Sequence, residues 1–461
     1  MQRWPFFLAV ALIALTPDAY GARARWTVMI FMNGDNNLES DAVLDFNEIA
    51  EVGGTADVNV VVQFDRYVPE NALTEPDWSD AYRFVVGKDT KAIPVNAVQS
   101  LGEVNMVAGA VLADFVIWAR EHYKADRYAL ILWGHGNGYR RIGPETSQEP
   151  CDEEDAPPAG ARLSKPITLP MGTLAPPVRG TSSDWTTRGE DMLYTSELTA
   201  ALQLALGKGN QLDLIGFDTC LMGMTEVAYA MRDVAKVMIS SEDLEPGEGW
   251  DYTRWLAPLI ANPSAYDARS LARLIVRSYK DSMREGSFED RTLAAIDLTQ
   301  TGDLVDLLST LSGALIRDLG RQKRAVDEAR RSCLYYAPKS CERGTADCVF
   351  HVDLRKFTEG LAQSRFASAA VRRYARSVSD CIDAMVIDKY RGPLRVDHGS
   401  HGLAIYFPAT RDEYACDPLA PGAYYRSNRE FPVTFVADRK VLWVDFLQAY
   451  LDVRDGAACG E

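Results

Sequence analysis

Two stretches decide the fold and the chemistry of this chain: LILWGHGNG at residues 130–138 and LDLIGFDTC at residues 212–220. Each is a short apolar run bounded by glycine and polar residues, a pattern typical of a buried strand in a parallel sheet. The carboxyl ends of parallel strands meet at one edge of an open α/β sheet, and ligands bind there. The sequence therefore predicts that His135 and Cys220 lie together at that edge.

A thiol beside an imidazole is the minimum requirement for a cysteine nucleophile, because the base removes the proton and the thiolate attacks. Taken singly, His135 would more often cap a strand and Cys220 would more often be a small buried apolar residue. Gly134 and Gly136 leave the imidazole uncovered. Cys220 is expected at a strand-to-helix junction, where helix N-terminal amides favour a thiolate and bind an oxyanion. The pair favours a cysteine hydrolase.

Strands alternate with helices through the first half of the chain. Strands are expected at residues 26–32, 58–64, 82–86 and 237–240, in addition to the two quoted above. Helices are expected at residues 41–52, 106–123 and 221–234. This order predicts a doubly wound, mostly parallel sheet flanked by helices. Longer helical patterns from about residue 262, with a late strand at 402–407, predict an additional C-terminal α/β region packed on the first.

The N-terminus has the pattern of a signal peptide over residues 1–24. Arg3 precedes a ten-residue apolar run at 6–15, which is too short to span a bilayer and is followed by small residues. No later stretch approaches about 18 uninterrupted apolar residues. These features predict export to the periplasm, the medium or the cell surface, with no stable membrane insertion.

The remaining chain divides into a first α/β region at 25–261, which contains His135 and Cys220, and a C-terminal region at 262–461. Residues 137–189 make the connection between the two strands longer than one crossover needs. They are rich in proline and glycine, which predicts a surface loop or insertion. Eight cysteines fit export, and the close spacing of Cys333, Cys341 and Cys348 favours a disulfide among these three.

Charge distribution indicates the kind of partner. The formal net charge of −16 argues against nucleic acid and suits basic polypeptides. SEDLEPGEGWD at 241–251 holds five acids and no base, and it follows a strand expected beside the one that ends at Cys220. A solvated loop is the simpler interpretation. Together with Asp218, however, such carboxylates beside a nucleophile would select a basic side chain.

Two patterns in the sequence resemble parts of cofactor sites without completing one. Gly134-x-Gly136-x-Gly138 resembles part of a dinucleotide fingerprint, but the residues after it do not begin a convincing helix. His398-x-x-His401 with Asp397 matches no standard metal spacing. The chemistry is expected to need no cofactor.

These segments together resemble the clostripain family of cysteine peptidases, in the caspase-like clan. The resemblance rests on WTVMIFMNGDNNL at 26–38, LILWGHGNG, LDLIGFDTCLMGMTEVAYAM at 212–231, SSEDLEPGEGWDY at 240–252 and GLAIYFP at 402–408. It implies a caspase-like sheet, a His135/Cys220 dyad, and cleavage after Arg or Lys with Asp218 and Glu248 binding the substrate. It also implies maturation by cleavage between the two catalytic residues, and calcium dependence in some members.

The combined expectation is an exported cysteine endopeptidase that cuts after Arg or Lys, self-processing as a zymogen. The backbone N–H groups of Gly136 and Cys220 would form the oxyanion hole. The sequence names no third residue that orients His135. The alternative is a catalytically silent caspase-like binding or adhesion module at the cell surface.

Overall fold

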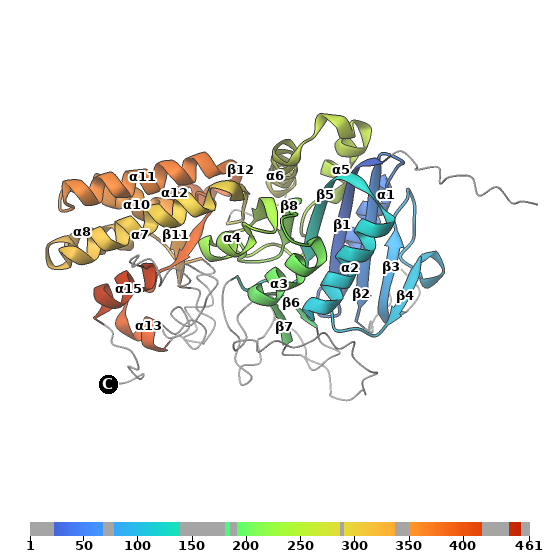
Figure 1. Cartoon of the computed structure of the whole chain (residues 1–461), viewed down its shortest axis with the longest axis horizontal. Helices are drawn as coiled ribbons and strands as arrows, with labels where there is room; N and C mark the ends of the chain where they lie inside the picture. The colour runs from blue at the N-terminus through green and yellow to red at the C-terminus, as the bar shows by residue number, and fades with distance from the viewer. Residues whose placement is uncertain are drawn as a thin grey trace, which may run out of the picture.

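A nine-stranded sheet runs through the molecule in the order β12-β10-β9-β8-β5-β1-β2-β3-β4 (Figure 1). The computed structural model describes residues 23–67, 78–138, 180–184, 191–285, 290–336, 350–416 and 442–452. The strands of this sheet are β1 Ala24–Gly34, β2 Val58–Arg66, β3 Asp80–Val85, β4 Gln99–Gly102, β5 Ala125–Trp133, β8 Leu212–Asp218, β9 Ala235–Ser240, β10 Thr292–Asp297 and β12 Val386–Arg391. The five central strands are parallel and the outer pairings are antiparallel. The mostly parallel, doubly wound sheet is confirmed.

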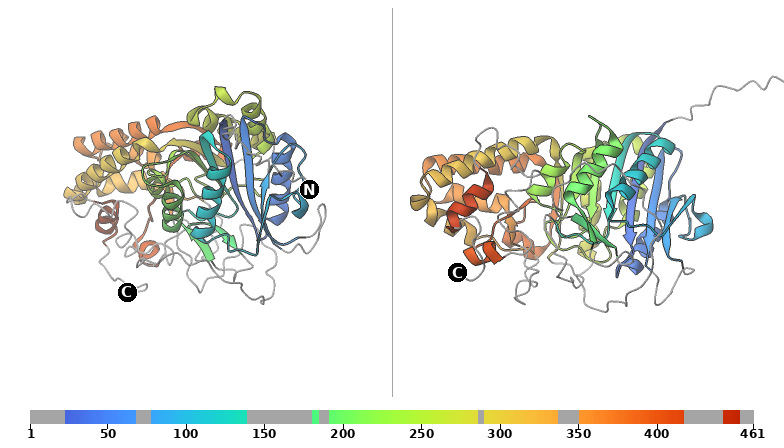
Figure 2. Two further views of the ribbon diagram at one scale, coloured as in Figure 1. Left: turned by 45° about the vertical axis from the view of Figure 1, so that its right-hand side comes forward. Right: turned by 60° about the horizontal axis from the view of Figure 1, so that its bottom comes forward.

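Helices cover both faces of this sheet, as Figure 2 shows. One face carries α1 Glu39–Val52, α5 Tyr252–Ala261 and α6 Ala268–Glu285, and the other carries α2 Gly109–His122, α3 Thr195–Leu206 and α4 Thr225–Met231. Alternate residues of β1 enter the two cores, Val28 and Ile30 on the α1 side and Met29 and Phe31 on the α2 side. The sheet is therefore buried on both faces, which explains why its central strands read as continuous apolar runs.

The C-terminal region adds a layer of long helices beside the sheet (Figure 1). They are α7 Thr301–Arg317, α8 Leu319–Arg331, α10 Leu354–Gln363 and α11 Ala369–Met385, followed by the shorter α12 Pro393–His398, α13 Arg411–Cys416 and α15 Trp443–Leu451. A small antiparallel pair, β11 His351–Asp353 and β13 Ala404–Tyr406, supplies the expected late strand. Because β10 and β12 join the main sheet, that sheet continues across residue 261. The proposed boundary there stays a prediction.

Several expectations fall on residues outside the described part of the chain. Residues 1–22 of the expected signal peptide are among them, as are residues 139–179 and 185–189 of the insertion. Between these lies β6 Gly180–Asp184, which pairs with β7 Asp191–Tyr194. Among the helices that the structure describes, none is long and apolar enough to span a lipid bilayer.

Cys333 is a free, buried thiol rather than half of a disulfide. It lies just after α8, where its Sγ donates to the Ala329 carbonyl at 3.3 Å. Cys333 therefore has no part in the disulfide expected among the three cysteines, because it packs into the helical core instead of lying in a loop. A bridge between the other two stays a prediction. Cys341 and Cys348 lie outside the described residues.

Two glycines with the same backbone conformation, one at the end of α1 and one in β4, allow the packing around the end of α1 to be tested. Gly53 and Gly102 both have φ of +67°, but a Cβ at Gly53 would lie 2.7 Å from Lys88 Cα and closer still to its backbone nitrogen, whereas none of the other described atoms lies within 4 Å of one at Gly102. Gly102→Ala should cost about 1 kcal/mol through its backbone conformation alone. Gly53→Ala should cost at least about 2 kcal/mol more from overpacking. Urea unfolding of both variants measures the difference, and equal losses would contradict this packing.

Candidate active site

The register between β5 and β8 brings the two candidate catalytic residues together. Trp133 is paired with Asp218 in these parallel strands, so His135 and Cys220 each lie two residues beyond the same pair. One more backbone hydrogen bond joins the two segments beyond this pair: the Gly134 N–H donates to the Asp218 carbonyl at 3.3 Å. The expected edge of the sheet therefore holds both side chains.

Gly136 lies directly against the segment that carries the thiol. A Cβ at this position would be 2.8 Å from Thr219 Cβ and closer still to the Cys220 carbonyl oxygen. Only glycine allows so close an approach. This contact holds the two strand ends together and supports a shared site for the Gly136 and Cys220 N–H groups.

The thiol of Cys220 is covered by the loop that follows β9. The residue is only 6% exposed, and the Glu245 N–H donates to its Sγ at 3.3 Å. The neighbouring Leu221 N–H donates to the Asp243 carbonyl at 3.0 Å. A backbone donor aimed at sulfur favours negative charge on the sulfur.

The expected helix start at residue 221 is wrong, since α4 begins only at Thr225. Leu221 has φ of +63°, which is incompatible with a right-handed helix. The Gly223 N–H donates to the Ser241 carbonyl at 2.6 Å. Residues 221–223 therefore bond to the segment just after β9 and do not form a helical turn. Cys220 is consequently not at a helix N-terminus, and the N–H groups that surround it come from loops.

Asn37 is a site residue that the sequence analysis missed. Its Oδ1 lies 2.7 Å from Nε2 of the half-buried His135. An amide oxygen only accepts, so Nε2 carries the proton and Nδ1 remains as the base. The signal was present in MNGDNNL at 32–38: this turn follows β1, and β1 is the other neighbour of β5.

Asp218, the last residue of β8 and two residues before Cys220, is only 4% exposed. Its Oδ2 accepts from the Trp250 N–H at 3.2 Å and from the Tyr252 hydroxyl at 3.0 Å. Burial raises the pKa of Asp218 to about 7, and these two hydrogen bonds oppose the rise. Glu248 belongs to the same loop as Trp250, but its side chain is exposed. The structure thus places the two expected substrate-binding acids in different environments.

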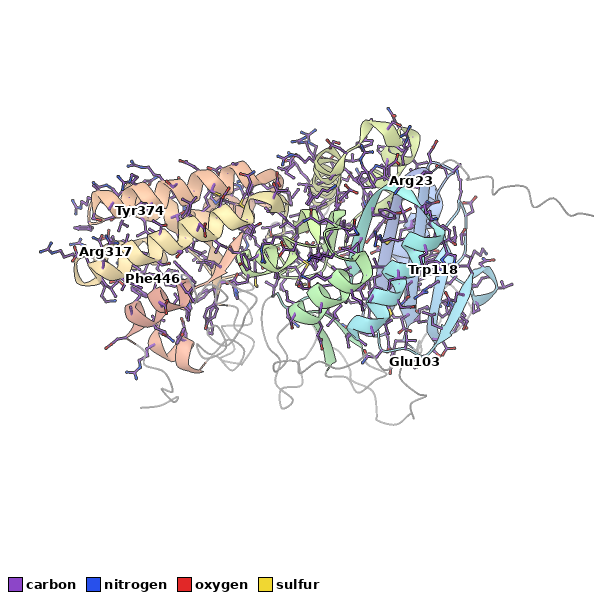
Figure 3. All side chains as sticks on the ribbon, in the orientation of Figure 1. Arg23, Glu103, Trp118, Arg317, Tyr374 and Phe446 are labelled. Atoms are coloured by element: carbon purple, nitrogen blue, oxygen red, sulfur yellow. The ribbon has the colours of Figure 1, made fainter. Side chains whose placement is uncertain are left out.

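Three carboxylates gather at the same edge of the sheet, where β1 and β2 end. Oxygens of Asp35, Asp65 and Glu103 lie within 4.8 Å of one another. The first two residues are buried, whereas Glu103 is exposed at the lower end of the sheet in Figure 3. Calcium binds oxygens at 2.3–2.6 Å, so two of its ligands can be about 5 Å apart. The donor set therefore fits a calcium ion.

A buried thiol and a half-buried imidazole follow adjacent strands of a caspase-like sheet, as expected for a cysteine peptidase. Comparison with known proteins agrees. The sequence profile of the Clostripain family matches residues 30–150 and 176–449. Clostripain of Hathewaya histolytica is 22% identical over 446 residues, spanning 87% of this chain and 77% of that protein. The chain belongs to the clostripain family and is a cysteine endopeptidase.

Solved structures of C11 cysteine proteases share the fold. A secreted one from Bacteroides thetaiotaomicron, in complex with an irreversible peptide inhibitor, is 18% identical with a TM-score of 0.59, covering 93% of this chain and 99% of that one. An inactive zymogen from Parabacteroides distasonis is 17% identical with a TM-score of 0.56, covering 84% and 92%. The similarity therefore extends through the C-terminal helices.

The Asn37 contact predicts a defect in turnover rather than in binding. Asn37→Ala should lower kcat on the order of tenfold to a hundredfold, with KM nearly unchanged, because a misoriented imidazole still allows substrate to bind. Asn37→Asp retains an acceptor oxygen and should recover most of the rate. Steady-state kinetics on a peptide substrate decide this, and full activity of Asn37→Ala would exclude a positioning role.

Proposed function

We propose that this chain is an exported endopeptidase that hydrolyses peptide bonds after Arg or Lys through a His135/Cys220 dyad. The observation that carries the proposal is the buried carboxylate of Asp218, two residues before the thiol. A carboxylate so close in the chain to a nucleophile favours a cationic side chain in the substrate. Glu248, exposed on the loop after β9, would add to the attraction of a cationic side chain.

The dyad would work as follows. His135 Nδ1 takes the proton of Cys220, and the thiolate attacks the scissile carbonyl carbon. The N–H groups of Gly136 and Cys220 stabilise the resulting oxyanion, a contribution of about 3–4 kcal/mol per donor. The imidazolium then protonates the leaving amine as the C–N bond breaks. Water, deprotonated by His135, hydrolyses the thioester and regenerates the thiol.

Substrate preference is the direct test. Peptide-library profiling should show Arg or Lys before the cut, and Asp218→Asn should lower kcat/KM for those substrates on the order of a hundredfold, since a buried charge partner is lost. Activity on neutral residues should fall far less. A wild-type profile that favours acidic or large apolar residues would refute the pocket assignment.

Self-processing forms part of the same proposal. Arg162, Lys165 and Arg179 of the insertion are the favoured cleavage positions, and all three lie outside the described residues. One relative of similar fold, from Parabacteroides distasonis, is described as an inactive zymogen. Proline- and glycine-rich loops with small polar residues are preferred sites of nicking.

Gel analysis of wild type beside Cys220→Ala tests the maturation step. Wild type should yield two fragments with a rise in activity, whereas Cys220→Ala should stay full-length because it lacks the nucleophile. Two full-length proteins, with the wild type fully active, would exclude self-maturation. Cleavage of both proteins would assign the cut to another protease.

We also propose that the protein is exported and that it binds a calcium ion. The signal-peptide pattern supports export, and the Bacteroides thetaiotaomicron relative is described as secreted. The chemistry needs no cofactor, because thiolate and imidazole supply both nucleophile and base. Asp35, Asp65 and Glu103 would hold a calcium ion that stabilises the strand ends near Asn37 rather than taking part in the reaction.

A further inference from the structure

A second buried carboxylate lies close to that of Asp218, and Gly249 packs against both. Asp45, on α1, is 2% exposed, and its Oδ2 accepts from the Trp133 indole N–H at 2.6 Å. A Cβ at Gly249 would lie 3.0 Å from Asp218 Oδ2 and 3.1 Å from Asp45 Oδ2. Two carboxylates from different elements, one on β8 and one on α1, therefore converge on a single position.

Neither carboxylate has a cationic partner in the described part of the chain. Their hydrogen-bond donors are all neutral: the indole of Trp133, the amide of Trp250 and the hydroxyl of Tyr252. Asp45 and Asp218 make no ion pair with any described Arg, Lys or His. Burying carboxylates without a countercharge is costly. An asparagine amide would anchor the Trp133 indole equally well without that cost, so anchoring alone does not explain an acid at position 45.

We propose that Asp45 is a second specificity-determining residue, and that the cationic side chain of the substrate binds between Asp45 and Asp218. This inference rests on the proposed preference for Arg or Lys. It assigns to α1 a role in substrate selection. A planar guanidinium with donors on several edges suits two carboxylates that approach it from different elements.

The surroundings of the pair are acidic or neutral. Helix α1 adds Asp41 and Glu48, the loop after β9 adds Glu245, and α5 and α6 add the hydroxyls of Tyr252 and Tyr279. The positive charges near this group act at its periphery, Arg254 on Glu48 and Arg291 on Glu245. The countercharge is thus left for the substrate to supply.

Proton binding gives the pair a measurable signature. Burial and the neighbouring Asp218 hold the pKa of Asp45 well above its ordinary value, and burial raises the pKa of Asp218 to about 7. The free pair therefore retains a proton near neutral pH, which a bound cation expels. KM for basic substrates should fall as pH rises through about 7.

The same shift affects stability. A carboxyl whose folded pKa lies above its unfolded value binds more protons when folded, so stability is lost as pH rises between the two values. For Asp218 this window runs from 3.8 to about 7. Asp45→Asn keeps an oxygen that can accept from Trp133 and removes one buried charge. It should raise Tm at pH 8.

The test compares Asp45→Asn with Glu48→Gln, a control on the next turn of α1 whose carboxylate accepts from the Tyr252 N–H at 2.9 Å. The measurement is kcat/KM for paired peptides with Arg or its neutral isostere citrulline before the cut. Asp45→Asn should lower the Arg-to-citrulline ratio at least tenfold, as expected for loss of one buried charge partner. It should also flatten the pH dependence of KM while raising Tm. Glu48→Gln should leave the ratio unchanged.

The outcomes separate this inference from the proposed function. An unchanged ratio for Asp45→Asn, with wild type strongly preferring Arg, would overturn the role of Asp45 and leave the preference intact. A lower Tm with an unchanged ratio would make Asp45 a structural anchor. Equal losses in Asp45→Asn and Glu48→Gln would reduce the effect to long-range charge and also overturn it. A wild type that does not distinguish Arg from citrulline would refute the proposed function itself.

Discussion

The parallel pairing of β5 with β8 is the constraint on which the rest of the site depends. With Trp133 opposite Asp218 at the strand ends, the second residue after each strand brings an imidazole or a thiol to the same edge of the sheet. A shift by one residue would turn one of these side chains to the other face. The strands hold this register because both faces of the sheet are buried, so every apolar residue along them opposes a slip.

The same edge collects negative charge that the fold does not neutralise. Asp218 and Asp45 are buried beside neutral donors only, among the described residues, and this arrangement lowers the free energy of unfolding at neutral pH. Buried, strained or unpaired groups are found where binding or catalysis requires them. The destabilisation caused by these two buried carboxylates is consistent with a pocket whose charge is neutralised only when a basic side chain enters.

The sequence predicted those parts of the fold and site that depend on continuous local patterns. Apolar runs located the strands, and the residues just after two of them located the thiol and the imidazole. The helix expected at 221 failed because Leu221 adopts a positive φ and its neighbours bond to the loop after β9, neither of which apolar spacing reveals. Asn37 and Asp45 were missed because they reach the site from the β1–α1 segment, far from it in the chain.

Covalent labelling tests the central claim most directly. The claim is that Cys220 is a nucleophile, that His135 is its base, and that a pocket for a cationic side chain lies beside them. Purified protein is treated with an arginyl chloromethyl ketone, and the site of modification is mapped by mass spectrometry. The account predicts one adduct per chain, on Cys220, with labelling abolished in Cys220→Ala and strongly slowed in His135→Ala and by excess arginine-containing peptide. Labelling of Cys333 or Cys381 at a rate comparable to Cys220, indifferent to His135 and to competing peptide, would contradict it.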